Sequence, residues 1–253
     1  MSACRKALIG KAAEATHGGF LLDYCLQEHD KKNASRRALL DQANPAMQKS
    51  HGIYERAFER WKLATAAPAF QSADCATKGR MIVGLGAKTV LEIGIALHHT
   101  YGVPYIPATA LKGIASHYCM GVWGAQDPEF LLNGAHHSVL FGTQKSAGFI
   151  QFEDAWLLPR CLKSKQAGVL IDVMTVHHGR YYMATDDTPP SDFDDPNPVS
   201  FLSVSGAFRI AVCCGTEGTE GNKWAQLALK LLKEALLYNG TGAKTASGYG
   251  KLS

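Results

Sequence analysis

The sequence lacks the features that identify several classes of protein. It contains seven cysteines but no Cys-x-x-Cys pair. This odd count favours reduced thiols over a disulfide framework or a zinc site. No apolar run is long enough to span a bilayer, and no basic start leads into an apolar stretch with a small-residue cleavage site. We therefore expect a cytoplasmic protein without a membrane partner or a signal peptide.

The composition that remains is typical of a globular protein. Hydrophobic residues make up 46% of the chain and charged residues 19%, which argues against long disordered regions. The net charge is only +4, but residues 184–200 hold five aspartates and no basic residue. The rest of the chain is therefore more strongly basic, which suits an anionic partner.

Residues 1–78 carry apolar residues at helical spacing, for example Ile53, Ala57 and Trp61. We expect a helical N-terminal segment there, packed on a main domain over residues 79–253. The charged stretch 28–37 is typical of a solvated face. An alternative stays open, in which its basic residues contact nucleic acid or a neighbouring subunit; these are Lys31, Lys32, Arg36 and Arg37.

After Arg80 the pattern changes to period two over residues 91–97, which predicts a strand with one buried face. A helical insertion is expected at 126–143 and an excursion from the sheet at 168–200. A further strand, a long amphipathic helix over 223–236 and a short strand over 249–252 complete the chain. This order predicts an α+β fold with a ferredoxin-like, or RRM-like, sheet and a protruding hairpin or loop.

The segment from Pro104 to Gly113 predicts a loop that opens a helix, with Leu111, Ala115 and Tyr118 on its inner face. The start of a helix has free N–H groups and the positive end of the dipole, so it can hold a phosphate. Lys112 near this start adds a cation where acids are usually preferred. We therefore expect Lys112 to contact an anion.

A glycine-rich stretch, Gly240–Gly250, follows the last helix. Glycine adopts positive φ and lets the backbone approach another group closely, so this loop can offer N–H groups, a cation and a ring to a phosphate chain. It is not a Walker A loop, since the Gly-Lys-Ser/Thr order is absent. A helix cap followed by a turn is the structural alternative. The candidate RNA-binding residues here are Gly242, Lys244, Thr245, Gly248 and Tyr249.

Histidines occur in adjacent pairs, at 98–99, 136–137 and 177–178. Neighbours in a strand point to opposite faces, and this spacing lacks the pattern of a metal site, so we expect no metal and no cofactor. Two histidines can act as acid and base at a ribose 2′-OH, but stacking on bases or donating to phosphate needs no special pKa. The candidates are His98, His99, His177 and His178.

The excursion also carries Asp172 and the run Arg180-Tyr181-Tyr182. Asp172 can serve as a general base or a metal anchor, or can organise a turn. A cation beside aromatic rings suits single-stranded nucleic acid, so Arg180 joins the candidate RNA-binding residues. The two tyrosines fit the core and rim of a hairpin equally well.

These blocks together resemble the RAMP superfamily, the RNA-binding subunits of CRISPR effector complexes. Gly240–Gly250 resembles its glycine-rich loop. Val103–Gly113 resembles its Ile-Pro-Gly-Ser-Ser-Leu-Lys-Gly motif, with Ala108 and Ala110 in place of the usual Gly and Ser. Residues 140–142 and 148–156 resemble its Phe-Gly turn and following strand. The resemblance covers about residues 80–253 and is greatest to the sixth-subunit family of the type III-B, or Cmr, complex.

This resemblance implies an RNA-binding structural subunit rather than an enzyme. Such a subunit holds guide (CRISPR) RNA and target RNA near the guide 3′ end and packs on neighbouring RAMP backbone subunits, in defence against foreign nucleic acid. Target cleavage belongs to another subunit of such complexes. The alternative is a metal-independent endoribonuclease that processes guide RNA with its paired histidines.

Overall fold

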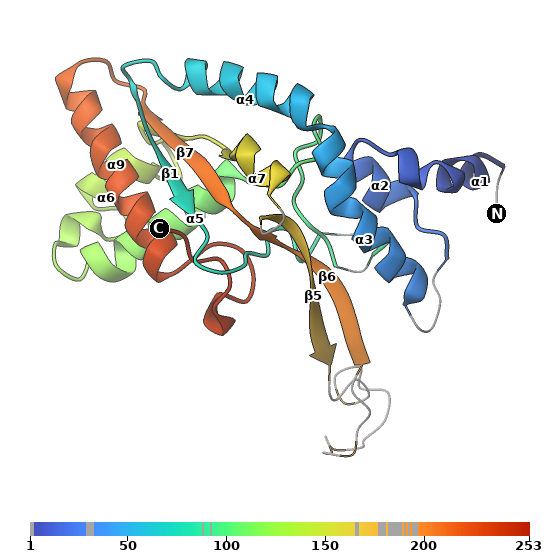
Figure 1. The fold of residues 1–253 in the computed structure, drawn as a ribbon. Coiled ribbons are helices and arrows are strands. Elements are labelled where there is room, and N and C mark those ends of the chain that lie inside the picture. Colours follow the sequence, from blue (N-terminus) through green and yellow to red (C-terminus); the bar gives the residue numbers. More distant parts are fainter. Residues whose placement is uncertain are drawn as a thin grey trace.

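The computed structural model describes residues 3–28, 33–87, 89–91, 93–164, 167–176 and 197–253, and also residues 181, 189, 191 and 193. The fold is of the α+β class, as expected, with helices packed around antiparallel strands (Figure 1). In the described part of the chain, no helix is both long enough and apolar enough to cross a membrane. The same part holds no group of three or more His, Cys, Asp or Glu residues able to bind a metal ion.

A five-stranded antiparallel sheet forms the centre of the molecule. Its central strand is β7 (Ala207–Cys214), which pairs with β1 (Phe70–Ala76) on one side and with β3 (Ile150–Phe152) and β4 (Ala155–Leu157) on the other. The short strand β2 (Tyr105–Ile106) pairs with β4. All of β7 except Arg209 is buried, because helices cover both of its faces and its sequence is apolar nearly throughout.

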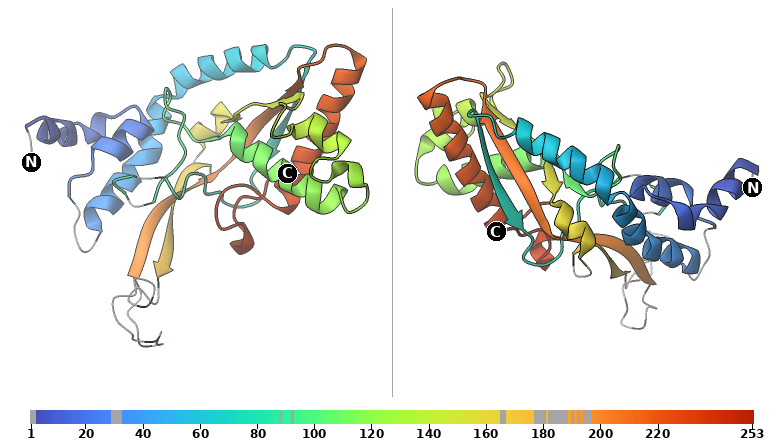
Figure 2. Two further views of the ribbon diagram at one scale, coloured as in Figure 1. Left: turned by 180° about the vertical axis from the view of Figure 1, so that it is seen from behind. Right: turned by 45° about the horizontal axis from the view of Figure 1, so that its top comes forward.

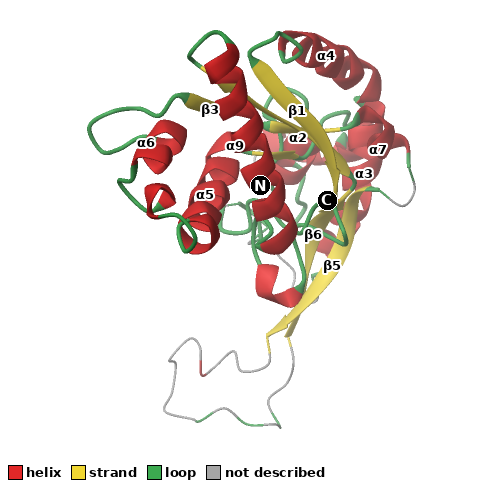
Figure 3. Cartoon of the chain, turned by 90° about the vertical axis from the view of Figure 1, so that its left-hand side faces the viewer, coloured by secondary structure: helices red, strands yellow, loops and turns green. Residues whose placement is uncertain are grey.

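Three helices cover one face of this sheet, α5 (Ala108–Tyr118), α6 (Ala135–Phe141) and α9 (Thr219–Tyr238) (Figure 3). The expected inner stripe of α5 is confirmed, since Leu111, Ala115 and Tyr118 are buried. The long amphipathic helix is also confirmed as α9. Its buried residues recur every three or four positions, as an apolar stripe against a sheet requires; they include Ala225, Ala228, Leu231, Leu232, Ala235 and Leu236.

The N-terminal helices lie on the other side of the sheet. Helix α4 (His51–Ala64) packs Tyr54 and Trp61 against Trp156 of β4, with ring centroids 5.7 and 5.5 Å apart. Helix α7 (Pro159–Lys163) lies beside α4. The remaining helices, α1 (Ala3–Gly10), α2 (Gly18–Tyr24) and α3 (Ala34–Lys49), extend from there toward the N-terminus (Figure 1).

A two-stranded hairpin of β5 (Gly168–Val176) and β6 (Asn197–Ser205) projects away from the sheet (Figure 2). It matches the expected excursion, although β6 extends past its expected end at residue 200. Gly206, with φ 152°, separates β6 from β7. A Cβ there would lie 3.0 Å from Leu157 Cδ1, so glycine lets the chain turn from hairpin to sheet against a packed neighbour.

Three expected elements are wrong. Residues 91–97 form no strand within their described part, because Gly84 and Gly94 bring the chain back on itself; a Cβ on Gly94 would lie 2.7 Å from Gly84 O. The short strand expected over 249–252 is reduced to a single bridge between Leu252 and Thr77. The segment 1–78 is mostly helical, as expected, although it ends in β1. The helix expected at 126–143 is instead a 3₁₀ turn (Pro128–Phe130) followed by α6, separated by Asn133 with φ 68°.

Candidate nucleic-acid interface

The glycine-rich loop (Gly240–Gly250) leaves the end of α9 and returns to the sheet. All four of its glycines have φ between 78° and 90°, where side chains are disfavoured. A Cβ on Gly242 would collide with the carbonyl oxygen of Ile82, and one on Gly250 with that of Thr241. The fold itself therefore requires these two glycines. A Cβ built on Gly248 instead meets no atom within 4 Å.

Part of the loop's backbone is already hydrogen-bonded. The N–H of Ala243 donates to Ile82 O and the N–H of Gly250 to Arg80 O, both at 2.8 Å. Four other N–H groups donate to no acceptor among the described residues, those of Gly242, Lys244, Thr245 and Ala246. Lys244 itself adopts the left-handed conformation, with φ 59°. Unpaired backbone donors beside a lysine are what an anion can accept.

Helix α5 lies next to this loop, and two hollows meet over it. One hollow is lined by Gly113 and His117 of α5 together with Gly242 and Thr245 of the loop. The other is lined by residues of α5 and of the segment 132–145. Gly113 lines both, so a continuous surface leads from the glycine-rich loop to Lys112, which lines the second hollow.

The N-terminus of α5 is capped by a carboxylate of this chain, where we expected a phosphate. Asp154 Oδ1 accepts the N–H of Ala108 at 2.7 Å, and this carboxylate takes the place expected for a phosphate at the helix start. Lys112 lies one turn further along, half-buried. An anion held by Lys112 would therefore bind over the side of α5 and not at its N-terminus.

His98 and His99 lie elsewhere, beside α2. The ring of His98 packs 4.7 Å from that of Tyr101 and 5.0 Å from that of Trp156. Its Nδ1 accepts the N–H of Thr100 at 3.2 Å. Burial lowers the pKa of His98, which favours the neutral form of its ring. It lines a hollow that shares none of the described lining residues with the two hollows over α5.

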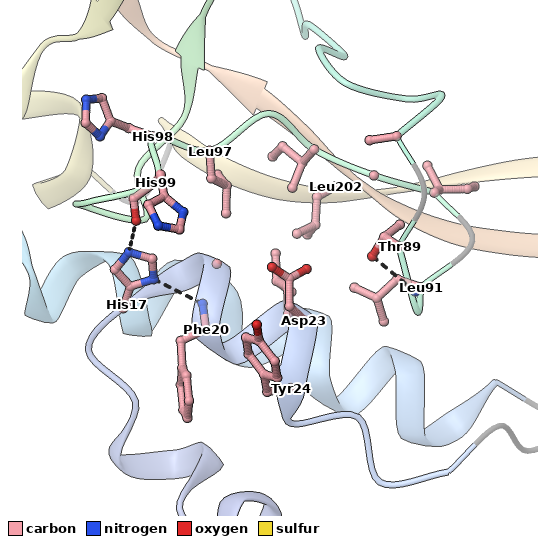
Figure 4. Close-up of a pocket in the computed structure, with 16 residues that line it drawn as sticks. His17, Phe20, Asp23, Tyr24, Thr89, Leu91, Leu97, His98, His99 and Leu202 are labelled. Carbon is pink, nitrogen blue, oxygen red and sulfur yellow. Dashed lines mark hydrogen bonds between the residues drawn. The ribbon is translucent and has the colours of Figure 1, made fainter.

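The backbone of His99 is fixed by a third histidine (Figure 4). His17 Nε2 is 2.9 Å from His99 O, and His17 Nδ1 accepts the N–H of Phe20 at 3.0 Å. His17 therefore caps α2 and ties it to the loop that carries His98 and His99. The other expected contact residues, His177, His178 and Arg180, lie outside the described residues.

Tyr249 forms a hydrogen bond with Asp172 that the sequence analysis did not predict. Its hydroxyl donates to Asp172 Oδ2 at 2.7 Å, and Arg80 Nη1 contacts the same oxygen at 3.0 Å. Burial raises the pKa of Asp172, but hydrogen bonds from Tyr249, the Val173 N–H and Arg80 outweigh it, so the pKa is lower than usual. The bond to Asp172, with burial, raises the pKa of Tyr249. Asp172 is thus an ionised, fully engaged group, which is not the situation of a free general base.

Sequence reasoning also missed Lys145. It lines the second hollow together with Lys112, on the turn that follows Gly142, whose φ is 84°. The Phe-Gly pair before it was a visible signal of a turn, but nothing in the pattern indicated which element this turn would face.

The chain is similar in sequence to known proteins. A family model of the RAMP superfamily matches residues 74–253. The chain is 30% identical over 226 residues to the CRISPR system Cmr subunit Cmr6 of Pyrococcus furiosus, an alignment that covers 70% of this chain and 65% of that protein. It is 25% identical over 178 residues to the Cmr6 subunit of Saccharolobus solfataricus, covering 68% of this chain and 54% of that protein. These alignments thus leave more than a third of each relative unmatched.

Solved structures give a similar result. The crystal structure of Cmr6 from Pyrococcus furiosus matches with a TM-score of 0.46 and 29% identity, over 72% of this chain and 96% of that one. A chain in the cryo-EM structure of type III-B Cmr-beta bound to cognate target RNA matches with a TM-score of 0.57 and 18% identity, over 98% of this chain and 86% of that one. The latter shows a shared fold. Since the family model spans well over half of the sequence, the chain belongs to the RAMP superfamily.

Proposed function

We propose that this chain is a non-catalytic, RNA-binding structural subunit of a cytoplasmic type III-B CRISPR effector (Cmr) complex. It holds guide RNA and target RNA near the guide 3′ end, against neighbouring RAMP backbone subunits. One observation carries the proposal. No Asp or Glu is among the described residues that line the two hollows over α5, whereas Lys112, Lys145 and the glycine-rich loop line them. A basic, acid-free surface is what a sugar-phosphate backbone requires.

The names of the relatives support the same proposal. The two similar curated proteins are both Cmr subunits, and the structure that covers nearly all of this chain is a Cmr complex bound to cognate target RNA. The loop residues expected to contact RNA, among them Lys244 and Thr245, also carry unpaired N–H groups.

We further propose that the five-stranded sheet is a ferredoxin-like sheet whose last strand is reduced. In that plan the order is fourth, first, third and second strand. Here the C-terminal residues lie beside β1, β1 beside β7, and β7 beside β3. The fourth strand shrinks to one antiparallel bridge between Leu252 and Thr77, flanked by a pair of hydrogen bonds between Ala76 and Ser253.

RNA binding as a function of salt tests the proposed function. Lys112→Ala and Lys244→Ala should each weaken binding of labelled single-stranded RNA and lower the slope of log affinity against log salt by about one, because each removes one phosphate contact. Lys62→Ala is the matched control, since Lys62 lies on α4 beside Glu59 on the other side of the sheet. Binding that does not change with salt, or equal losses in all three variants, would contradict the proposal.

The non-catalytic part of the proposal needs a separate assay. Labelled RNA incubated with the pure protein should remain intact both with and without EDTA. The packing of the His98 ring against Tyr101 and Trp156 supports this expectation. Cleavage that disappears in His98→Ala or His99→Ala would instead establish the guide-processing ribonuclease.

A further inference from the structure

Gly113 is an exposed glycine inside α5 that the fold does not need. A Cβ built on it meets no atom within 4 Å, and its φ lies outside the left-handed region. A glycine inside a helix costs about 1 kcal/mol of stability relative to alanine. Neither crowding nor backbone conformation within this chain explains why glycine, and not alanine, occupies position 113.

The position of Gly113 suggests that a ligand occupies the open space above it. It is the one described residue that lines both hollows over α5. On one side lie Gly242 and Thr245 of the glycine-rich loop, and on the other lie Lys112 and Lys145. A ligand that occupies both hollows must therefore cross α5 at Gly113, where the absence of a side chain allows the closest approach.

The second hollow has the chemistry of a phosphate site. Its lining combines two lysines with hydroxyl and amide side chains, and no carboxylate is among the described residues that line it; the polar residues are Thr109, Ser116, Asn133, Thr143 and Gln144. His137 also lines it and is only 3% exposed. Its Nε2 lies 3.2 Å from Ser116 Oγ, while its buried Nδ1 has no hydrogen-bond partner among the described residues. Two cations among neutral donors suit successive phosphates of one strand.

We propose that a single-stranded ribose-phosphate backbone runs from the glycine-rich loop over α5 to Lys145, and that Gly113 is its point of closest approach to the protein. This inference rests on the proposed function and adds the path of the strand and two contact residues, Gly113 and Lys145. Lys112 on α5 and Lys145 on the turn after Gly142 both line the second hollow, where they neutralise phosphates of the strand. An acidic protein segment is the other conceivable occupant, but the continuity with the unpaired N–H groups of the loop favours RNA.

Replacing one glycine by alanine tests the close approach. Gly113→Ala should keep or raise the stability of the protein, because alanine is the better helix former and has room. It should weaken binding of a fluorescein-labelled oligo(U) strand about tenfold, as expected when one charge-assisted contact is displaced. Gly52→Ala is the matched control. Gly52 is exposed in the first turn of α4 and also has open space around a built Cβ, so this variant should bind RNA like the wild type.

A second variant tests the far end of the path. Lys145→Ala should weaken oligo(U) binding and lower the salt slope by about one. The same variant can be tested in the assembled complex. If Lys145→Ala weakens binding of guide RNA alone, the path belongs to the guide. If it weakens binding only after target RNA is added, the path belongs to the target strand.

The possible failures can be told apart. Wild-type affinity of Gly113→Ala and Lys145→Ala, with weakened Lys112→Ala and Lys244→Ala, would overturn this path and leave the proposed function standing. Wild-type affinity of all four would overturn both. Equal losses in Gly113→Ala and Gly52→Ala, or lost assembly with neighbouring subunits at unchanged RNA affinity, would also overturn the path.

Discussion

Tyr249 and Asp172 are joined by a hydrogen bond of 2.7 Å that ties the glycine-rich loop to the protruding hairpin. Arg80 strengthens this junction, because its guanidinium contacts Asp172 Oδ2 at 3.0 Å and Ile171 O at 3.2 Å. The carbonyl of the same arginine accepts the N–H of Gly250. Since β5 and β6 form their own two-stranded sheet, this junction couples the orientation of the hairpin to the position of the loop.

The first prediction concerns that junction. Tyr249→Phe removes only the hydroxyl, so backbone amides of β5 and β6 should exchange with solvent faster, by an amount equivalent to about 1 kcal/mol for one hydrogen bond. Hydrogen exchange followed by mass spectrometry measures this without RNA. Tyr24→Phe is the control, because Tyr24 is 60% exposed on α2, away from the hairpin. Unchanged exchange in Tyr249→Phe would show that the hairpin is held by other contacts.

The second prediction is a pH dependence of the same junction. The pKa of Asp172 is lowered from its ordinary value of 3.8, so the folded state binds its proton less readily than the unfolded state. Its contribution to stability is therefore present above about pH 4 and is lost as pH falls through the lowered value. The difference in unfolding free energy between wild type and Asp172→Asn should be constant from pH 5 to 7 and shrink below pH 4. A difference that grows in acid would contradict this sign.

The elements with strong local patterns were predictable from the sequence. Helices α5 and α9 have apolar stripes whose spacing alone sets which side is buried, and both formed as expected. The glycine-rich loop was also recognisable, although part of its glycine content serves the fold and not a ligand. Gly242 and Gly250 are needed against the carbonyls of Ile82 and Thr241, contacts between segments that no local pattern shows.

The failures come from interactions between distant segments. Strand β1 has little alternation of its own and is a strand because Phe70–Ala76 pairs along its whole length with β7. Residues 91–97 alternate well, but close backbone contact between Gly84 and Gly94 prevents an extended chain. Asp172 and Tyr249 are 77 residues apart, so their bond depends on the whole fold.

The third prediction separates structural glycines from open ones. Gly242→Ala should destabilise the protein by about 2 to 3 kcal/mol, because the new methyl adds a collision with Ile82 O to the strain of positive φ. Gly248→Ala adds only the strain of a side chain at positive φ, because its surroundings are open, and should destabilise the protein by about 1 kcal/mol. Urea unfolding of both variants measures the difference. Equal losses would mean that the loop shifts to accommodate either methyl.

The fourth prediction tests whether His98 is a packing residue. His98→Phe keeps an aromatic ring beside Tyr101 and Trp156 and should be close to wild type in stability at pH 7, whereas His98→Ala should lose about 2 kcal/mol with that packing. The same variant tests the pKa of His98. Burial lowers this pKa in the folded protein, so the unfolded chain binds a proton more readily, and protonation in acid favours unfolding of the wild type.

The wild type should therefore lose stability relative to His98→Phe as pH falls below about 6.5. If His98→Phe instead shows the same pH dependence as the wild type, the buried ring is not the group that titrates. If it loses RNA affinity at unchanged stability, His98 contacts RNA directly, through a surface separate from the one over α5.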